Sequence, residues 1–102
     1  RAERAERVSR EAPFTVVVDA PTGPSLRRGV IDMVFREAGG WVVVDYKSDR
    51  IPGGTAPEEA AVKHAAQLAA YADAWTKLTG ERVIETGVYF LRHDAYVRNT
   101  VT

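Results

Sequence analysis

The order of the elements expected along this chain predicts an α/β or α+β domain, in which helices cover a β-sheet. Residues 27–37 and 41–47 are rich in β-branched residues and are apolar on both faces, as is typical of central strands covered on both sides. Residues 56–79 contain mostly good helix formers, and further strand-like segments follow them. Together these three observations indicate a sheet whose second half is reached through a long helix.

The first two elements are expected from local signals. Residues 1–8 (RAERAERV) favour a helix, because Ala, Glu and Arg have high helix propensity and Glu3 can pair with Arg7 one turn later. Residues 14–20 (FTVVVDA) favour a strand, which a stretch rich in proline and glycine ends. The two central strands come next, separated by the turn-forming sequence AGG.

The boundaries of the long helix also carry signals. Thr55 can cap its start, and Glu58 stands three residues later, which is the spacing of a capping box. Gly80 is expected to end the helix in a left-handed conformation. Residues 82–92 and 95–101 then read as two strands around a His-Asp turn.

Composition restricts the class of protein. A chain of 102 residues suits one domain, and its start without Met suggests a piece of a longer protein. Lys plus Arg and Asp plus Glu both number 14, which argues against binding nucleic acid through global charge alone. The absence of cysteine excludes a disulfide framework, a cysteine zinc site and an iron–sulfur cluster, and fits the reducing cytoplasm. No apolar run approaches the ~20 residues that span a bilayer, so no membrane association is expected.

Two aspartates are expected to face one another across the central hairpin. If the turn is the two-residue loop Ala38-Gly39, Asp32 lies opposite Asp45, and their Cβ atoms are about 4.5–5.5 Å apart. A four-residue loop would keep this register, whereas a three-residue bulged loop would shift it by one. Lys47, two residues beyond Asp45, shares the same face.

This arrangement is unfavourable for folding alone, since opposed like charges destabilise a sheet and a buried carboxylate needs a partner. A divalent cation supplies a reason, because Mg²⁺ or Mn²⁺ binds carboxylate oxygens. Lys47 could then orient a water molecule or stabilise charge on a phosphate. The alternatives are a solvated strand end at Asp45 and Lys47, and a hydrogen-bonded structural role for Asp32.

One stripe of the long helix is polar and aromatic. His64, Gln67 and Tyr71 share this face, next to an apolar stripe that contains Leu68, Ala72 and Trp75. Gln67 and Tyr71 could contact a phosphate or Lys47, while the alternative is an ordinary amphipathic helix edge. Because the chain has only two histidines, a multi-histidine metal site is not expected.

The ordered set GVID, VDYKSDR and QLAAY resembles the PD-(D/E)XK nuclease superfamily, and in particular the C-terminal nuclease domain of RecB- and AddA-type helicase–nucleases. The resemblance also includes the stretches REAPF (10–14) and GVYFL (87–91) and covers nearly the whole chain. It implies a restriction-endonuclease-like α/β fold with a central mixed β-sheet flanked by helices. It also implies that residues 1–102 form a single nuclease domain whose first helix is truncated.

The resemblance assigns a role to each position. It implies that Asp32 and Asp45 bind Mg²⁺ with the backbone carbonyl of Tyr46, and that Lys47 is the catalytic lysine. It further implies that Gln67 and Tyr71, the family's QxxxY motif, position DNA or this lysine, and that His64 lies near DNA. The family has a further ligand, a His or Glu, on a helix before the first strand. The candidates for that ligand are Glu3, Glu6 and Glu11, and none matches clearly, so the isolated fragment is expected to have reduced activity or none.

The resemblance therefore implies a Mg²⁺-dependent DNA exonuclease domain within an ATP-dependent helicase–nuclease of double-strand break repair and recombination. Its expected partners are DNA, helicase domains of the same chain and a partner subunit. The present chain has no GxxxxGK[ST] phosphate loop of its own. The rival interpretations are a DNA-holding or interaction module that does not cleave, a stand-alone nuclease of the superfamily, and a small domain with a purely structural carboxylate pair.

Overall fold

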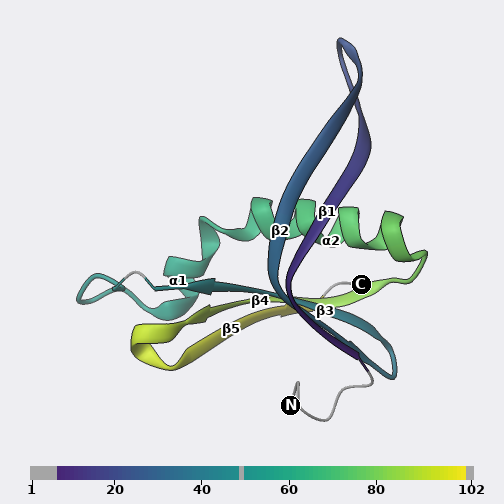
Figure 1. The fold of residues 1–102 in the computed structure, drawn as a ribbon. Coiled ribbons are helices and arrows are strands. Elements are labelled where there is room, and N and C mark those ends of the chain that lie inside the picture. Colours follow the sequence, from purple (N-terminus) through teal and green to yellow (C-terminus); the bar gives the residue numbers. More distant parts are fainter. Residues whose placement is uncertain (1–6, 49, 101–102) are drawn as a thin grey trace.

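The computed structural model describes residues 7–48 and 50–100, which form one five-stranded sheet with helices against it (Figure 1). The elements in chain order are β1 (Arg7–Ala20), β2 (Gly23–Glu37), β3 (Gly40–Lys47), α1 (Pro57–Val62), α2 (Ala65–Thr79), β4 (Val83–Phe90), the 3₁₀ turn η2 (Leu91–His93) and β5 (Ala95–Thr100). The strands lie in the order β1-β2-β3-β4-β5. Only the β3–β4 pair is parallel, and α1 and α2 form the connection between these two strands. The mixed sheet confirms the predicted fold class.

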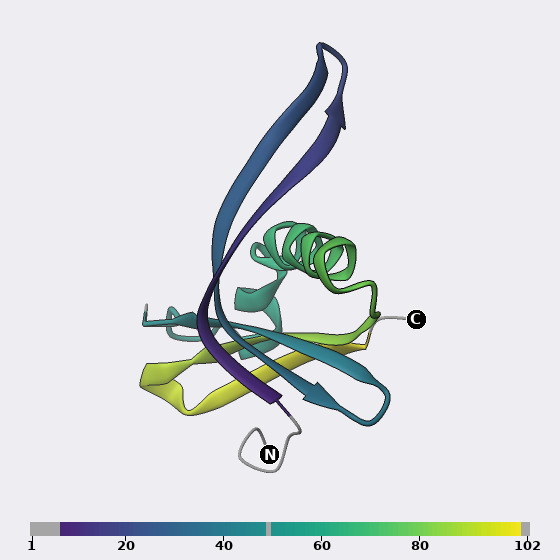
Figure 2. The same cartoon turned by 45° about the vertical axis from the view of Figure 1, so that its right-hand side comes forward.

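The hairpin of β1 and β2 is the longest feature of the fold. It leaves the sheet, crosses beside α2 and projects beyond it (Figures 1 and 2). Alternate residues of its β1 strand (Ala12, Phe14 and Val16) are buried, whereas Val17 and Leu26 near the tip are 60% exposed. The base of the hairpin therefore belongs to the core, and its tip does not.

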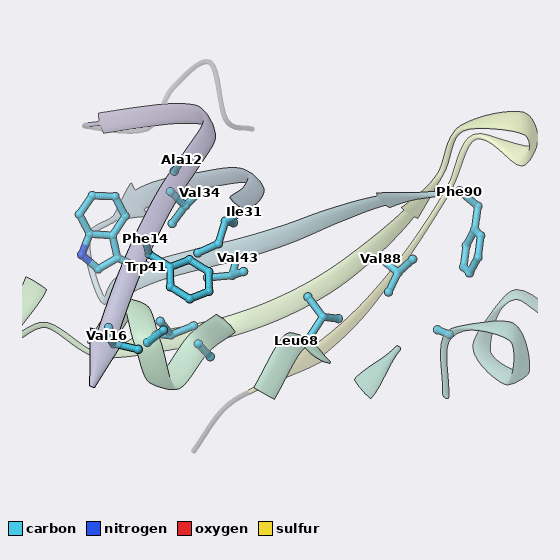
Figure 3. Packing of buried hydrophobic residues seen from close by; sticks show 14 of the residues in the cluster. Ala12, Phe14, Val16, Ile31, Val34, Trp41, Val43, Leu68, Val88 and Phe90 are labelled. Atoms are coloured by element: carbon cyan, nitrogen blue, oxygen red, sulfur yellow. The ribbon is translucent and has the colours of Figure 1, made fainter. Parts of the chain in front are cut away.

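The main core lies between the sheet and α2. Ile31, Val34, Val43 and Val88 from three strands are almost inaccessible to solvent, as is Leu68 of α2. Figure 3 shows Val88 and Leu68 pointing toward one another across this layer. Burial of side chains of this size contributes about 1.5–3 kcal/mol each, so this layer is the main source of stability.

The opposite face of the sheet carries a second, smaller apolar cluster. This cluster consists of four buried residues, Met33, Phe35, Val42 and Val44, against which Val8, Ile84 and Tyr89 pack. Both helices of the described residues lie on the other face of the sheet (Figure 2). The strands β2 and β3 are thus buried on both faces, as their sequences predict.

In the described part of the chain, no helix is long and apolar enough to cross a membrane.

Several expectations about element boundaries are wrong. Arg7 and Val8 extend β1 instead of a helix, because they pair with Arg36 and Phe35 of the long β2 strand; residues 1–6 of that expected helix lie outside the described residues. Pro13 is compatible with this longer β1, since β1 is an edge strand. The pairing partner thus overrides the helix propensity of the sequence.

The start of the helical segment differs from the expected capping box. The N-cap is Ala56, with no hydrogen bond from its side chain, rather than Thr55. Pro57 disfavours a helical conformation at the residue before it, so Ala56 is extended (φ −72°, ψ 149°) and Pro57 begins the helix.

The expected single helix is divided into α1 and α2 at Lys63 and His64. His64 has ψ −4°, close to the bridge region, and its N–H donates to the Ala61 carbonyl three residues earlier. On either side of the break, α1 and α2 each contribute to the main core, α1 through Ala61 and α2 through Leu68. The predicted stop is confirmed, because Gly80 caps α2 in the left-handed conformation at φ 72°.

Candidate active site

Asp32 lies where β2 bends out of the sheet. Ile31 and Val34 both belong to the core beside α2, whereas Met33 belongs to the opposite cluster, so the alternation of side chains is broken at Asp32. Across the strand, Glu11 has a positive φ of 51°, and the β1–β2 ladder has no pair at this point. Such irregularities re-aim side chains and are frequent beside active sites.

The central hairpin has the register that the sequence predicts. Glu37 pairs with Gly40 and Val34 with Val43, around the two-residue turn Ala38-Gly39. The ladder ends at Met33–Val44, one residue before the position where Asp32 would face Asp45. There the backbone N–H of Tyr46 donates to Asp32 Oδ2 at 2.8 Å. The Asp32 carboxylate thus meets β3 where backbone pairing stops.

Asp45 and Lys47 share the same face of β3. Lys47 Nζ lies 3.1 Å from Asp45 Oδ2, and the two side chains are 25% and 8% exposed. β4 supports both residues from the other side, because Asp45 pairs with Val88 and Lys47 with Phe90. The side chain of Tyr46 points to the opposite face, where its hydroxyl donates to Met33 Sδ at 3.3 Å. The structure thus brings Asp32, Asp45 and Lys47 together at one end of the sheet.

The electrostatics of Asp45 are unfavourable. Burial, followed by the Asp32 carboxyl beside it, raises the pKa of Asp45 from 3.8 to about 6, although the Lys47 ammonium opposes this shift. Asp45 Oδ2 lies within ion-pair distance of the Lys47 ammonium, but the two groups are not aligned for a regular hydrogen bond. Apart from this ammonium, no hydrogen-bond donor among the described residues reaches Asp45 Oδ2. The Asp45 carboxyl thus lies between a second carboxyl, Asp32, and the Lys47 ammonium.

These groups suit a divalent cation. A hard cation binds carboxylate oxygens such as those of Asp32 and Asp45. Its charge would offset the repulsion between the two carboxyl groups and would give Asp45 Oδ2 a partner. Mg²⁺ usually binds one or two carboxylates and keeps several waters. In the described part of the chain, no group of three or more His, Cys, Asp or Glu side chains is arranged to hold a metal. Glu11 is described and exposed, whereas Glu3 and Glu6 lie outside the described residues.

The helix residues form a separate contact. Gln67 Nε2 donates to the Tyr71 hydroxyl at 3.1 Å, and the Tyr71 ring packs edge-on against Phe14 of β1 at 5.4 Å between centroids. His64 begins α2 and lies 6.5 Å from the ring of Phe90, the residue that pairs with Lys47. Lys47 contacts Asp45 rather than Gln67, so the expected approach of Gln67 to the lysine is not made here.

Gly29 has a role that was not foreseen from the sequence. A Cβ atom at this position would lie 2.6 Å from the Phe14 ring and 3.3 Å from Tyr71. Gly29 pairs with Phe14 across the hairpin, so its missing side chain lets both aromatic rings lie over the strand. A glycine inside a strand pattern is the available signal, since it often marks such a close approach.

Comparisons with known proteins place these features in a family. The family model of the PD-(D/E)XK nuclease superfamily matches residues 1–100. An ATP-dependent helicase/nuclease subunit of Carboxydothermus hydrogenoformans is 38% identical over 93% of this chain and 9% of its own length. The proteins of the same name from Lysinibacillus sphaericus and Anoxybacillus flavithermus are 34% and 36% identical, over 96% and 87% of this chain and 8% and 7% of theirs. The chain thus spans less than a tenth of these relatives.

A solved structure has a similar fold. The crystal structure of SSO0001 superposes with a TM-score of 0.65 over 91% of this chain and 42% of its own, at 15% sequence identity. At this identity, the similarity concerns the fold alone.

Proposed function

Because the chain belongs to the PD-(D/E)XK nuclease superfamily, we propose that it hydrolyses DNA phosphodiester bonds with Mg²⁺, as the exonuclease domain of a longer ATP-dependent helicase–nuclease. Residues 1–102 form one such domain in this proposal. The observation that carries it is the convergence of Asp32, Asp45 and Lys47 on one face, where the buried Asp45 carboxylate lies beside a second carboxyl and its Oδ2 has no donor other than the lysine ammonium. A structural carboxylate pair would instead have its oxygens satisfied within the protein.

The carboxylates provide the metal ligands in this proposal. Asp32 and Asp45 bind the cation through side-chain oxygens, with Tyr46 contributing its backbone carbonyl, and Mn²⁺ can substitute for Mg²⁺. Once bound, such an ion supplies positive charge beside the scissile phosphate and lowers the pKa of a coordinated water. Asp32 also accepts the N–H of Tyr46, which holds its carboxylate in place before any ion arrives.

Lys47 acts on the reacting groups. Its ammonium is half-buried beside Asp45, where a water or a phosphate oxygen could replace the carboxylate as its partner. From there it orients the attacking water and stabilises negative charge that develops on the phosphate. A lysine suits this role because its ammonium is a compact charge with three donors on a flexible chain.

The polar stripe of the helical segment binds DNA in this proposal. The Gln67 and Tyr71 side chains are joined by a hydrogen bond near the surface, so together they can present donors to a phosphate. Packing of Tyr71 on Phe14 fixes the direction of this pair. His64 contributes a second contact, since its ring lies next to Phe90 at the end of the sheet that carries Lys47.

The biological setting follows from the relatives. Proteins named as subunits of an ATP-dependent helicase/nuclease share 32–41% identity with this chain. We propose that helicase domains of the same parent chain deliver DNA to this domain, with a partner subunit, during repair of double-strand breaks and recombination. The names of these relatives favour this setting over a stand-alone nuclease. The presence of Asp32, Asp45 and Lys47 together favours cleavage over a non-cleaving binding module.

A crystal of this chain soaked in Mn²⁺ tests the metal site directly. An anomalous-difference peak that touches both Asp32 and Asp45 is expected, and any further ligand would be visible in the same map. A peak elsewhere, or none at millimolar Mn²⁺, would contradict a two-carboxylate site in this chain. Soaking the Asp45→Asn variant provides the control, because loss of the peak in this variant alone shows that the carboxylate binds the ion.

A further inference from the structure

The turn between β4 and β5 holds the chain that follows Lys47. Arg92 Nε donates to the Ser48 carbonyl at 2.7 Å, and the Ile51 backbone N–H donates to His93 Nε2 at 2.9 Å. Both contacts join residues more than forty positions apart in sequence. Two adjacent side chains of one turn therefore hold the segment after Lys47 at two points.

These contacts begin where backbone pairing ends. Lys47 and Phe90 form the last pair of the β3–β4 ladder, and η2 follows directly after Phe90. Among the described residues beyond this pair, no backbone hydrogen bond between the two segments continues the parallel ladder. Beyond the ladder, the side chains of Arg92 and His93 instead contact the backbone of Ser48 and Ile51.

The turn itself is braced. The Tyr89 hydroxyl donates to Asp94 Oδ1, and Asp94 adopts a left-handed conformation at φ 46°. Aspartate tolerates this conformation better than most residues, and the hydrogen bond that its side chain accepts from Tyr89 holds it in place. On the other side of the contact, Ile51 is buried in the main core. Arg92 and His93 thus connect a braced turn to an anchored residue.

We propose that Arg92 and His93 are positioning residues for DNA cleavage. Together with the Ser48 carbonyl and the Ile51 amide they form a clamp, which keeps Lys47 beside Asp45 when DNA displaces their ion pair. This inference rests on the proposed nuclease function, and it assigns the clamp no contact with DNA. A small displacement of a reacting group costs a large factor in rate, so a side chain that restrains Lys47 affects turnover.

The same fold provides a matched control. Arg82 Nε donates to the Gly39 carbonyl at 2.9 Å, at the opposite end of β3. Arg82 and Arg92 are both exposed and both bind one main-chain carbonyl over a long sequence separation. Loss of either side chain removes the same kind of contact, but only Arg92 adjoins the chain after Lys47.

The test uses the intact parent protein with Arg92→Ala, His93→Ala and Arg82→Ala. The kcat for DNA cleavage is expected to fall about tenfold or more in the first two variants and to stay at the wild-type value in the third. The KM for DNA and the ATPase rate should stay within about twofold of wild type in all three. A rise in KM with unchanged kcat would overturn the proposal, because it would indicate a direct contact of Arg92 with DNA.

Substitutions at His93 separate positioning from packing. His93→Gln keeps a hydrogen-bond acceptor, the side-chain carbonyl, within reach of the Ile51 amide, and most of the turnover is expected to return. His93→Leu has a similar size but no acceptor, so it should behave as His93→Ala. Equal turnover in the Gln and Leu variants would overturn the role of this hydrogen bond.

Hydrogen exchange makes the result independent of cleavage. In the intact protein, peptides that contain Ile51 should exchange faster in Arg92→Ala and His93→Ala than in Arg82→Ala. Unchanged exchange would overturn the clamp whether or not the protein cleaves DNA. If exchange rises while neither the wild-type protein nor any variant cleaves, the clamp exists but the proposed nuclease function fails, and with it the role in catalysis.

Discussion

The two ends of β3 carry charged clusters of opposite character. At its beginning, the Glu81 carboxylate accepts a hydrogen bond from Trp41 Nε1 at 3.1 Å and pairs with the Arg36 guanidinium at 3.2 Å. These donors lower the pKa of Glu81. At the end of β3, Asp45 is buried beside a second carboxyl, and its pKa is raised to about 6. The Glu81 carboxylate thus accepts hydrogen bonds from two side chains, whereas the Asp45 carboxylate is buried beside a second carboxyl group.

This contrast separates a stabilising cluster from the candidate active site. Glu81 has two donor side chains and remains partly exposed, so its charge costs little. Burial of the charged Asp45 carboxylate lowers the stability of the folded chain, and a bound cation would offset this loss. Titratable groups with strongly shifted pKa values concentrate at functional sites.

The largest expected effect is the loss of cleavage in Lys47→Ala. In the intact parent protein we expect at least a ~100-fold fall in nuclease rate, because the ammonium no longer stabilises charge on the phosphate. ATPase activity should be unchanged and the domain should remain folded, but with lower thermal stability, because the ammonium that opposes the raised pKa of Asp45 is lost. Lys77→Ala is the matched control, since Lys77 forms a similar 3.0 Å pair with Asp73 on the surface of α2. Retained cleavage in Lys47→Ala would rule out the assigned role.

The next effect is a gain of stability in Asp45→Asn. A shift of the pKa from 3.8 to about 6 represents ~3 kcal/mol at most, and we expect about 1–2 kcal/mol of stabilisation because the amide must also be buried. Urea denaturation of the metal-free chain at pH 7 measures it, and cleavage by the parent should be lost. A less stable variant would mean that the Lys47 ion pair outweighs the cost of burial.

This gain should depend on pH. The folded chain holds the Asp45 proton more tightly than the unfolded chain, so the stability from this group is present below about pH 4 and is lost as pH rises through about 6. The Asp45→Asn variant lacks this dependence. Its advantage over wild type should therefore be small at pH 4 and reach its full size above pH 6, in urea titrations with a chelator present. A difference that does not vary with pH would contradict the raised pKa of Asp45.

The smallest effect concerns Glu81→Gln. Removal of this charge weakens its contacts with Arg36 and Trp41, so the urea midpoint should fall slightly, whereas Asp45→Asn raises it. DNA cleavage by the parent should stay at the wild-type rate. If Glu81→Gln stabilised the chain or reduced cleavage, the contrast between the two ends of β3 would fail.

Short-range rules were sufficient to predict much of this arrangement. The Ala38-Gly39 turn sets the pairing of β2 with β3, and the two-residue period of a strand then puts Asp45 and Lys47 on one face. Gly80 ends α2 as predicted, because glycine alone adopts its conformation without a steric cost. The sequence by itself thus determined the hairpin, the candidate triad and the end of the helix. Each of these depends on residues that are close along the chain.

Tertiary structure decided the remaining features. Val8 joins β1 because Phe35 offers a pairing partner. The helical segment divides at His64, and both of its parts contribute to the main core, through Ala61 and Leu68. The contacts of Arg92 and His93 with the segment after Lys47 connect positions more than forty residues apart. No local pattern specifies such contacts, because their free energy arises only when packing brings distant segments together.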